Sequence, residues 1–430
     1  MNETTLLAEE QLKDKHYLKS VTQLGDVRPI VANRDIHASS GIKLISSGMR
    51  IDSSLYERLL NHKLIPELDQ CLATDDIVTG ASLAENASRM MQEDKRLALI
   101  QSVRSDGQTL PLILKQVPLN PAIAFKLTVM RETQADLFQH SIFVALVGIY
   151  IGMQLEMNRN QLIDIATAAL LHDIGQMHMD PKLLERGHKM TMAERRHLYV
   201  HPVTGSMILN TYPEYRQKVL DAVLQHHERL DGSGYPRGLK AGEIGQFGQI
   251  IAVAEIVASR YGGENAESSG LRLETILKLN MRRYGENIVR YLKVFYQEEA
   301  DPPPCSDDDK QVAKEMMSRI SGIFSSWDKA QAEFDPNSPV CKYIYERMMN
   351  LKIEIIDAGL DLNVEDKNLF GIEGDSRACL DMRTLLDETL WQLRDILLEI
   401  RRRWPSNDAE NPAIVHGAVN SWIAEIETML

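Results

Sequence analysis

Histidine is concentrated in the middle of this sequence. Of 12 histidines in 430 residues, eight lie between His140 and His227. Residues that can bind metal ions recur there in LLHDIGQMHMDP, YVHPVTGSMIL, LQHHERLDGSGYPRGL and QIIAVAEIVASRY, each about one helix and one loop after the last. Separate helices can deliver such side chains to one point. The candidate ligands are His140, His172, Asp173, His201, His226, His227 and Glu255, with Asp136 as an additional candidate.

This mixed set of imidazoles and carboxylates indicates a particular chemistry. All-carboxylate ligation would favour hard ions, and all-thiolate ligation would favour zinc or metal clusters. Imidazoles with a few bridging carboxylates suit a pair of divalent ions, which make bound water nucleophilic near neutral pH and neutralise charge on a phosphoryl group. The pattern therefore predicts metal-assisted hydrolysis of a phosphate ester.

Each ligand is a weak signal when taken alone. A lone histidine at a helix end is more often a cap or a surface residue, and we expect His178, His188 and His197 to be surface residues. Glu255 differs because it interrupts an apolar run. A buried carboxylate without a partner costs several kcal/mol, so Glu255 must bind a cation or a metal, or else face solvent.

The candidate ligands lie on predicted helices, because apolar residues recur around them at intervals of three and four. Gly175 ends one helix just after His172 and Asp173. Pro202 suits the first position of the next, so we expect that helix to begin at His201. The expected helices cover residues 131–157, 160–175, 201 onward, 213–229 and 249–261.

The whole chain is predicted to be mainly α. Two runs rich in β-branched residues, 27–37 and 42–51, indicate a few strands near the N-terminus, and DPPPCSDDD reads as a linker. The predicted parts are residues 1–75, a small α+β module; 76–123, a helical connector; 124–299, an all-helical metal-dependent domain; 300–310, a linker; and 311–430, a C-terminal helical domain.

Four helices are expected beyond the linker, over residues 308–328, 338–359, 376–403 and 411–429. The third has an apolar stripe that is most simply the core of a bundle, with a coiled-coil seam of a homodimer as the alternative. The stripe consists of Met382, Leu386, Leu390, Leu393, Leu397 and Ile400.

Composition narrows the functional classes. With 44% apolar and 25% charged residues the chain can bury more than one core. The net charge of -13 argues against binding long nucleic acid. The longest apolar run, residues 142–153, is too short for a membrane span, and the N-terminus lacks the apolar core of a signal peptide. Four separate cysteines suit a reducing compartment, so we expect a cytoplasmic protein.

The motifs HDIGQ, HPVTG, HHERLDGSGYPRGL and AVAEIVA, in that order, resemble the HD-GYP family. This is the bacterial subgroup of the HD phosphohydrolases that degrades the second messenger cyclic di-GMP. The resemblance covers about residues 131–299, and HHERLDGSGYP is close to the complete family signature.

The resemblance implies roles for individual residues. His140, His172, Asp173, His201, His226 and His227 match the family's metal ligands, with Asp173 as the bridging carboxylate. Glu255 falls at the last aspartate ligand, and Asp136 falls where some members place a glutamate for a third metal. The metals implied are two ions of iron or manganese, or three if Asp136 takes part.

The same resemblance implies a substrate-binding loop. Gly234, Tyr235 and Pro236 match the GYP residues, which border the substrate and are implicated in contacts with diguanylate-cyclase (GGDEF) domains. Arg229 and Asp231 lie in the matching loop, where an arginine could bind a phosphate and assist catalysis, or hold Asp231.

Two residues depart from the family pattern. Gln176 replaces a lysine that would contact phosphate, and Glu255 is one methylene longer than the usual aspartate. A shift of about 1 Å in a catalytic centre can lower the rate about a hundredfold. The leading hypothesis is a phosphodiesterase that opens cyclic di-GMP to linear pGpG and onward to GMP. The alternatives are a degenerate receptor or scaffold that binds cyclic di-GMP, and a hydrolase of another nucleotide or phosphate ester.

Overall fold

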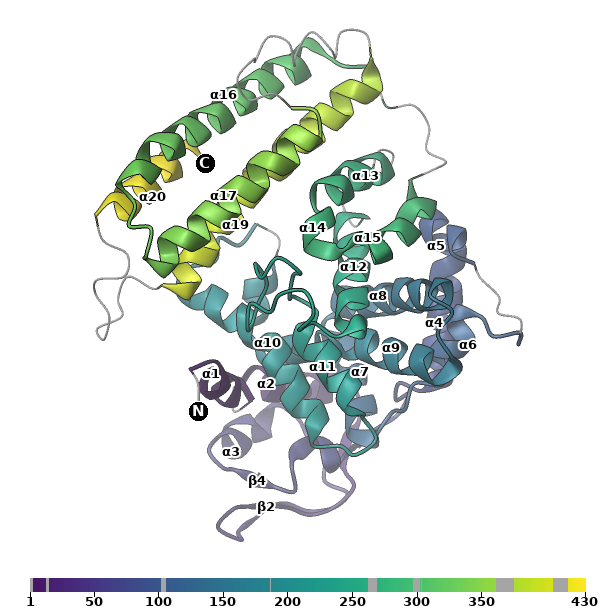
Figure 1. The fold of residues 1–430 in the computed structure, drawn as a ribbon. Coiled ribbons are helices and arrows are strands. Elements are labelled where there is room, and N and C mark those ends of the chain that lie inside the picture. Colours follow the sequence, from purple (N-terminus) through teal and green to yellow (C-terminus); the bar gives the residue numbers. More distant parts are fainter. Residues whose placement is uncertain are drawn as a thin grey trace. The chain divides into compact units, whose positions relative to one another are not determined.

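The computed structural model describes residues 3–12, 15–101, 106–185, 187–261, 269–296, 302, 304–360, 375–404 and 417–430. Helices dominate, as predicted (Figure 1). The chain divides into two compact units, Met1–Ser259 with Arg290–Leu292, and Arg260–Val289 with Lys293–Leu430. The finer division predicted from the sequence remains a prediction.

The N-terminal residues of the first unit form two small antiparallel sheets. One sheet pairs β1 with β5, and the other has the order β3-β2-β4. The first predicted β-rich run forms two strands, β1 and β2, because residues 33–35 turn between them. The elements are α1 (Glu3–Leu12), α2 (Lys15–Val27), β1 (Ile30–Ala32), β2 (Ile36–Ala38), β3 (Lys43–Ile45), η1 (Ser53–Leu55), α3 (Tyr56–Leu60), β4 (Leu64–Ile65), η2 (Leu68–Gln70) and β5 (Leu72–Thr74).

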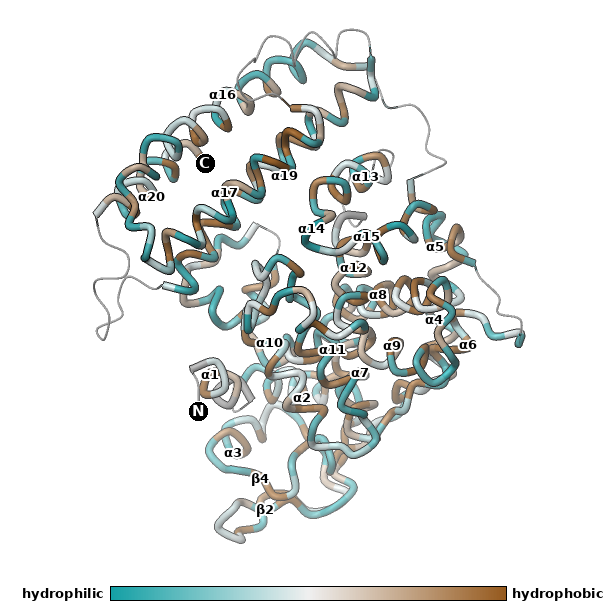
Figure 2. The backbone as a smooth tube through the Cα atoms, viewed as in Figure 1, coloured by the Kyte–Doolittle hydropathy of each residue, from teal (hydrophilic) through white to brown (hydrophobic). Residues whose placement is uncertain are grey.

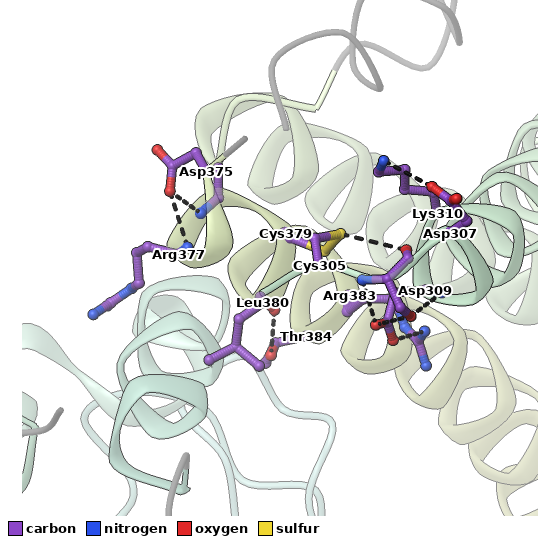
Figure 3. The surroundings of a disulfide bond; sticks show 12 residues. Cys305, Asp307, Asp309, Lys310, Asp375, Arg377, Cys379, Leu380, Arg383 and Thr384 are labelled. Carbon is purple, nitrogen blue, oxygen red and sulfur yellow. Dashed lines mark hydrogen bonds and ion pairs between the residues drawn. A yellow bond between two sulfur atoms is a disulfide. The ribbon is translucent and has the colours of Figure 1, made fainter. Parts of the chain in front are cut away.

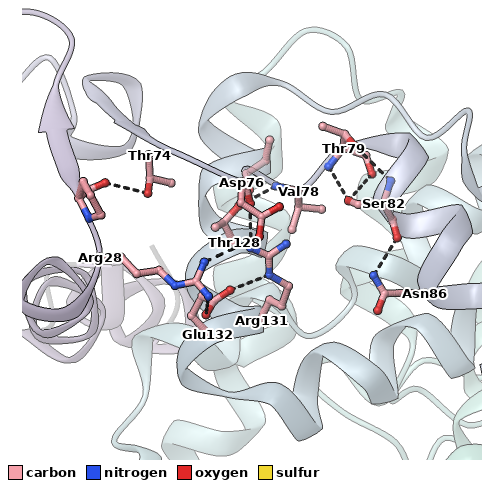
Figure 4. A network of polar contacts seen from close by, with 12 residues as sticks. Arg28, Thr74, Asp76, Val78, Thr79, Ser82, Asn86, Thr128, Arg131 and Glu132 are labelled. Atoms are coloured by element: carbon pink, nitrogen blue, oxygen red, sulfur yellow. Dashed lines mark hydrogen bonds and ion pairs between the residues drawn. The ribbon is translucent and has the colours of Figure 1, made fainter.

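A polar network joins these N-terminal elements to the following helices (Figure 4). Arg28, just after α2, pairs with Glu132 at 2.7 Å. Arg131 pairs with Asp76 at 3.0 Å and also donates to its carbonyl oxygen. These contacts fix the N-terminal elements against the helix that contains Arg131 and Glu132.

The rest of the first unit consists of helices packed around one apolar helix, α8. Thirteen of its residues are buried, and its glycines lie against the next helix, where a Cβ on Gly152 would come within 2.7 Å of Leu162. The elements are α4 (Gly80–Glu93), α5 (Lys95–Leu99), α6 (Leu110–Leu114), α7 (Pro121–Thr133), α8 (Ala135–Gln154), α9 (Arg159–Leu171), η3 (Ile174–His178), η4 (Pro181–Leu184), α10 (Met192–Asn210), α11 (Gln217–Gln225) and α12 (Gln246–Tyr261).

Helix α8 is long and apolar enough to cross a membrane by length and composition, but 72% of that stretch is buried inside the protein. Burial of this kind is typical of the central helix of a folded domain. Figure 2 shows its strongly hydrophobic character.

Several predicted helix boundaries are wrong. Helix α9 ends at Leu171 rather than at Gly175, and α11 covers Gln217–Gln225 rather than residues 213–229. The expected helix over residues 131–157 is broken at Gln134, whose φ of -142° and ψ of 59° separate α7 from α8. The helix expected to begin at His201 begins at Met192 and contains Pro202 in its interior. Its start is set by a capping box in which Thr191 and Glu194 satisfy each other's backbone N–H groups.

The second unit is a helical bundle. The predicted stripe on α19 lies in its core: Leu386, Leu390, Leu393, Leu397 and Ile400 are buried and Met382 packs against them. Hydrophilic and hydrophobic residues alternate along the long helices (Figure 2). The elements are α13 (Ser269–Leu279), α14 (Met281–Tyr284), α15 (Glu286–Val289), η6 (Arg290–Phe295), α16 (Asp307–Ala330), η7 (Gln331–Glu333), α17 (Pro339–Asp357), α19 (Ser376–Arg403) and α20 (Ala418–Met429).

A disulfide joins Cys305, just before α16, to Cys379 in α19 (Figure 3). Their Cα atoms are 5.9 Å apart. Arg383, one turn beyond Cys379, donates to Asp309 at 3.0 Å and so holds the same two helices together. The cysteines were expected to suit a reducing compartment; this pair departs from that expectation, whereas Cys71 and Cys341 are free and buried.

Candidate metal centre

Every candidate ligand from the sequence except Asp136 falls into one of two groups. His140 from α8, His172 at the end of α9 and Glu255 from α12 form the first group, in which one ligand atom of each lies within 4.8 Å of the others. Glu255 Oε2 is 2.9 Å from His140 Nε2 and 3.3 Å from His172 Nε2. The longer glutamate side chain therefore reaches both imidazoles of its group.

The second group consists of Asp173, His201, His226 and His227. Asp173 precedes η3, His201 lies in α10, and the two adjacent histidines follow α11. Asp173 also faces the first group, since its Oδ2 is 3.2 Å from His172 Nε2 while its Oδ1 is 3.0 Å from His201 Nε2. Asp173 thus lies where a carboxylate bridging two ions would lie.

Three of the imidazoles are oriented by backbone carbonyls. Nδ1 of each lies within hydrogen-bond distance of the carbonyl three residues earlier: His172 to Ala169 at 2.7 Å, His201 to Leu198 at 2.6 Å, and His226 to Val223 at 2.6 Å. A carbonyl can only accept, so each ring donates from Nδ1 and, when neutral, leaves Nε2 as an unprotonated ligand atom. This is the usual orientation of a metal-bound histidine.

Pro202 contributes to the orientation of His201. A proline has no N–H, so in the middle of α10 it leaves the Leu198 carbonyl, four residues earlier, without its helical hydrogen bond. The His201 ring donates to this same carbonyl. Pro202 therefore frees the Leu198 carbonyl, and the candidate ligand His201, directly before it, donates to that carbonyl.

The donor set fits divalent ions. Nε2 of His201 lies 3.2 Å from Nε2 of His226, and two unprotonated nitrogens facing each other at this distance require a cation or a proton between them. His172 Nε2 and Asp173 Oδ1 are buried atoms that make no geometrically acceptable hydrogen bond. Buried polar atoms without such partners are costly, and binding of metal ions would satisfy all of these atoms.

Histidines of the two groups differ in the direction of their pKa shifts. Burial lowers the pKa of His226 to about 4, and burial followed by the nearby His226 and His201 lowers the pKa of His227. Burial also acts to lower the pKa of His140 and His172, but the carboxylates of Glu255 and Asp173 outweigh it and raise both.

The two carboxylates shift in the opposite direction. Burial acts to raise the pKa of Asp173 and of Glu255, but the neighbouring imidazoles outweigh it, and both carboxyl groups have a pKa well below the usual range. Both are therefore ionised at neutral pH, as ligands for metal cations must be.

Close packing places Asp173 next to His201. A Cβ on Gly175 would lie 2.2 Å from the His201 carbonyl oxygen, so only glycine lets η3 approach α10 this closely. The prediction that Gly175 ends the helix is wrong, because α9 ends at Leu171 and Gly175 lies inside η3; the close approach of η3 to α10 is the reason for glycine there.

The loop after His227 is folded back onto it. A Cβ on Gly234 would lie 2.4 Å from the His227 carbonyl oxygen, and the Tyr235 ring stacks on the His227 ring with centroids 4.5 Å apart. The Tyr235–Pro236 peptide bond is cis. The predicted GYP loop therefore borders the second group directly.

Other polar residues shape this loop. Arg229 donates to the carbonyls of His226 and Glu228, and Asp231 accepts from the Ser233 N–H. Glu228, which the sequence analysis overlooked, is buried and accepts from the backbone N–H groups of Arg237 and Leu239 at 2.7 and 2.9 Å. The sequence does indicate such a role for Glu228, because a charged residue stands there between the two histidines and a glycine-rich loop.

Three further residues complete the comparison with the sequence. Gln176 is buried in η3, three residues after Asp173. Asp136 is exposed in the first turn of α8 and joins neither group. The prediction that His178 is a surface residue is wrong, because only 5% of it is exposed and it lies 3.4 Å from Lys126 Nζ.

Comparison with known proteins gives matches to this part of the chain. A family model described as an HD domain matches residues 119–286. A cyclic di-GMP phosphodiesterase of Pseudomonas aeruginosa is 29% identical over 41% of this chain and 42% of its own length. A 3′3′-cGAMP-specific phosphodiesterase of Vibrio cholerae is 26% identical over 46% of this chain and 44% of its own length.

The chain therefore spans less than half the length of these relatives. A solved structure of an HDGYP protein from Bdellovibrio bacteriovorus aligns with 61% of this chain and 94% of that chain, at 15% identity and a TM-score of 0.34.

Proposed function

We propose that this chain is a metal-dependent phosphodiesterase that opens cyclic di-GMP to linear pGpG and onward to GMP, because residues 119–286 match an HD-domain family model and similar proteins are named as cyclic dinucleotide phosphodiesterases. One observation carries the proposal: Asp173 faces His172 with one carboxylate oxygen and His201 with the other, and so connects the two groups. Two divalent ions held there would supply an activated water and neutralise the charge of a phosphodiester.

The residues of the chain have distinct proposed roles. His140, His172 and Glu255 would hold one ion, and His201, His226 and His227 the other, with Asp173 shared. Iron and manganese are the proposed ions, because mixed imidazole and carboxylate ligation suits them better than all-oxygen or all-sulfur sites do. A third ion would require Asp136 to turn inward from its exposed position.

The loop after His227 would form one wall of the substrate site. Tyr235 lies against a ligand ring, Gly234 lets the chain fold back onto the His227 carbonyl, and Pro236 follows in the same loop. Arg229 would neutralise phosphate charge from its place beside the His226 carbonyl. Asp231 shapes the loop through its bond to Ser233, and Gln176 offers an amide in place of a cation near Asp173.

A direct assay tests the proposal. The purified chain, loaded with manganese or iron and checked for bound metal, is incubated with cyclic di-GMP, 3′3′-cGAMP and the phosphomonoester GMP. Production of pGpG from cyclic di-GMP supports the proposal. Protein that retains its metal but leaves cyclic di-GMP intact contradicts it, and preferential cleavage of cGAMP would support the alternative of another nucleotide substrate.

The alternative of a degenerate receptor is less well supported. Several relatives are named as phosphodiesterases, and Glu255 reaches both imidazoles of its group despite its extra methylene. Gln176 remains the departure that could slow turnover. If Gln176→Lys raises the rate of cyclic di-GMP cleavage while binding is unchanged, the missing cation limits the reaction.

The proposal extends to the partners and the location of the protein. Cyclic di-GMP is the proposed ligand, and a diguanylate-cyclase (GGDEF) domain is a proposed partner of the exposed part of the GYP loop, where Arg237 is exposed. A cytoplasmic location is consistent with a cyclic dinucleotide substrate and with the burial of α8, whereas the Cys305–Cys379 disulfide is more typical of an oxidising compartment. The apolar stripe of α19 lies in the core of its own bundle, so it is not available as the seam of a homodimer.

A further inference from the structure

A cavity of about 620 Å³ lies in the first unit, away from the two ligand groups. On one side it is lined by residues of α2, α3, β4 and η2, and on the other by residues of α7, η3 and α10 or just beyond it. Its volume is within the range of about 300–1,000 Å³ that is typical of small-molecule sites. The N-terminal elements and the metal-ligand helices thus line one common pocket.

The deepest part of the cavity is polar but has no net charge. Lys126 and Asp69, only 4% and 8% exposed, form an ion pair of 2.6 Å. Tyr17 donates its hydroxyl to Asp69 at 2.5 Å, and its ring lies 3.6 Å from Lys126 Nζ. His178 lies on the other side of Lys126, at 3.4 Å. An additional unpaired charge placed here would be costly to bury.

The walls of the cavity are mainly apolar. They include buried leucines of α3 and η2, Ile208 of α10 and the ring of Tyr212. Leu60, at the rim, remains 36% exposed. The rim carries Lys63 and Glu67, whose opposite charges balance. This combination favours a ligand with an apolar body, a hydrogen-bonding group and no net charge.

The cavity is connected to the metal centre by two elements. Helix η3 begins directly after Asp173 and ends at His178 in the cavity. Helix α10 carries His201 and, about two turns later, the cavity residues Met207 and Ile208. Gly175 locks these two elements together, because η3 can approach the His201 carbonyl only without a side chain. A shift of either element would move a ligand.

We propose that this cavity binds an uncharged, mainly apolar small molecule, and that binding changes the affinity of the metal centre through η3 and α10. The first part of this proposal stands on the cavity alone. The second part rests on the proposed function, because it requires the two ligand groups to bind metal.

The full chain is titrated with N-phenyl-naphthylamine, an uncharged dye whose fluorescence rises in apolar sites, and with its anionic analogue anilinonaphthalene sulfonate. Leu60→Glu places a charge at the rim of the cavity. Leu99→Glu is the matched control, because Leu99 is 40% exposed and, like Leu60, is the last residue of a five-residue helix, but it does not line the cavity.

The proposal expects one saturable site that prefers the uncharged dye, with affinity at least about tenfold weaker in Leu60→Glu and within about twofold of wild type in Leu99→Glu. Absence of saturable binding, a preference for the sulfonate, or equal loss in both variants overturns the cavity as a ligand site.

Coupling is measured by repeating the dye titration with and without saturating manganese. Linkage requires the dye to change manganese affinity by the same factor by which manganese changes dye affinity, and we expect a factor of at least about three. Equal dye affinity in metal-free and manganese-bound protein overturns the coupling. If manganese does not bind at all, the proposed metal centre fails while the dye result still decides the cavity.

Discussion

Glu255 places a carboxylate oxygen 2.9 Å from Nε2 of His140, although the two residues lie 115 positions apart in sequence. This contact closes the first ligand group, because the same oxygen also lies 3.3 Å from His172. It indicates that the longer acidic side chain has been accommodated by the positions of α8 and α12.

Removing the negative charge of Glu255 should therefore remove one of the two metal ions selectively. We expect Glu255→Gln to lower the bound manganese from about two ions to about one per chain, because an amide oxygen is a much weaker ligand than a carboxylate. Glu255→Asp, which keeps the charge, should retain both. Elemental analysis after dialysis measures this. Two tightly bound ions in Glu255→Gln would show that Glu255 is not a ligand.

Asp173 should affect both ions, because it faces both groups. We expect Asp173→Asn to lose most of its bound metal and to reduce turnover of cyclic di-GMP by at least about a hundredfold, which corresponds to about 2.7 kcal/mol of transition-state stabilisation. Asp136→Asn is the control, since Asp136 is exposed and lies outside both groups. If Asp136→Asn also loses an ion, the chain has a further metal site that includes Asp136.

Metal binding should depend on pH differently at the two groups. His140 and His172 have a raised pKa in the metal-free protein, so protons must leave them before a metal binds. Affinity at this group should fall as the pH is lowered and rise until the pH exceeds the raised pKa. His226 has a pKa of about 4 and His227 is also lowered, so neither competes with metal at neutral pH.

Calorimetric titration with manganese between about pH 6 and pH 9, the interval in which histidine and its shifted forms change charge, should resolve this difference. The expected result is one binding step with a strong pH dependence and one with a weaker dependence. In Glu255→Gln, the strongly dependent step should disappear. Two steps with identical pH dependence would contradict the assignment of the raised pKa values to one group.

The sequence selected the candidate ligands but not their division into two groups. Residue type and order were sufficient to select His172 and Glu255, whereas their distance depends on how α9 and α12 pack, which periodicity does not specify. The start of α10 was misplaced because His201-Pro202 resembles a helix start, although Thr191 and Glu194 in the sequence supply a better capping box.

The other errors also concern contacts between distant positions. His178 was assigned to the surface because nothing near it in the sequence indicates a partner, yet Lys126, 52 positions away, meets it in the core. Strands β4 and β5 contain two and three residues, too few to show an alternating pattern. The partner of Cys305 could not be inferred from spacing, since 74 positions separate it from Cys379.

Pro202 offers a test of how His201 is held. In Pro202→Ala the new N–H can bond to the Leu198 carbonyl and compete with the His201 ring. We expect manganese affinity of the second group to fall by about tenfold, within the range seen when residues that orient a metal ligand are changed, while far-ultraviolet circular dichroism is unchanged. Pro213→Ala, at an exposed turn after α10, is the control. Unchanged affinity in Pro202→Ala would contradict this role.

The disulfide between Cys305 and Cys379 should stabilise the second unit by restricting its unfolded state. We expect Cys305→Ser to lower the free energy of unfolding of this unit by about 2–4 kcal/mol in urea. A reductant should produce the same loss in the wild-type chain and no further loss in the variant. Thiol titration of the unfolded, non-reduced wild-type chain should find Cys71 and Cys341 only. Four reactive thiols, together with equal stability of variant and wild type, would show that the bond does not form in solution.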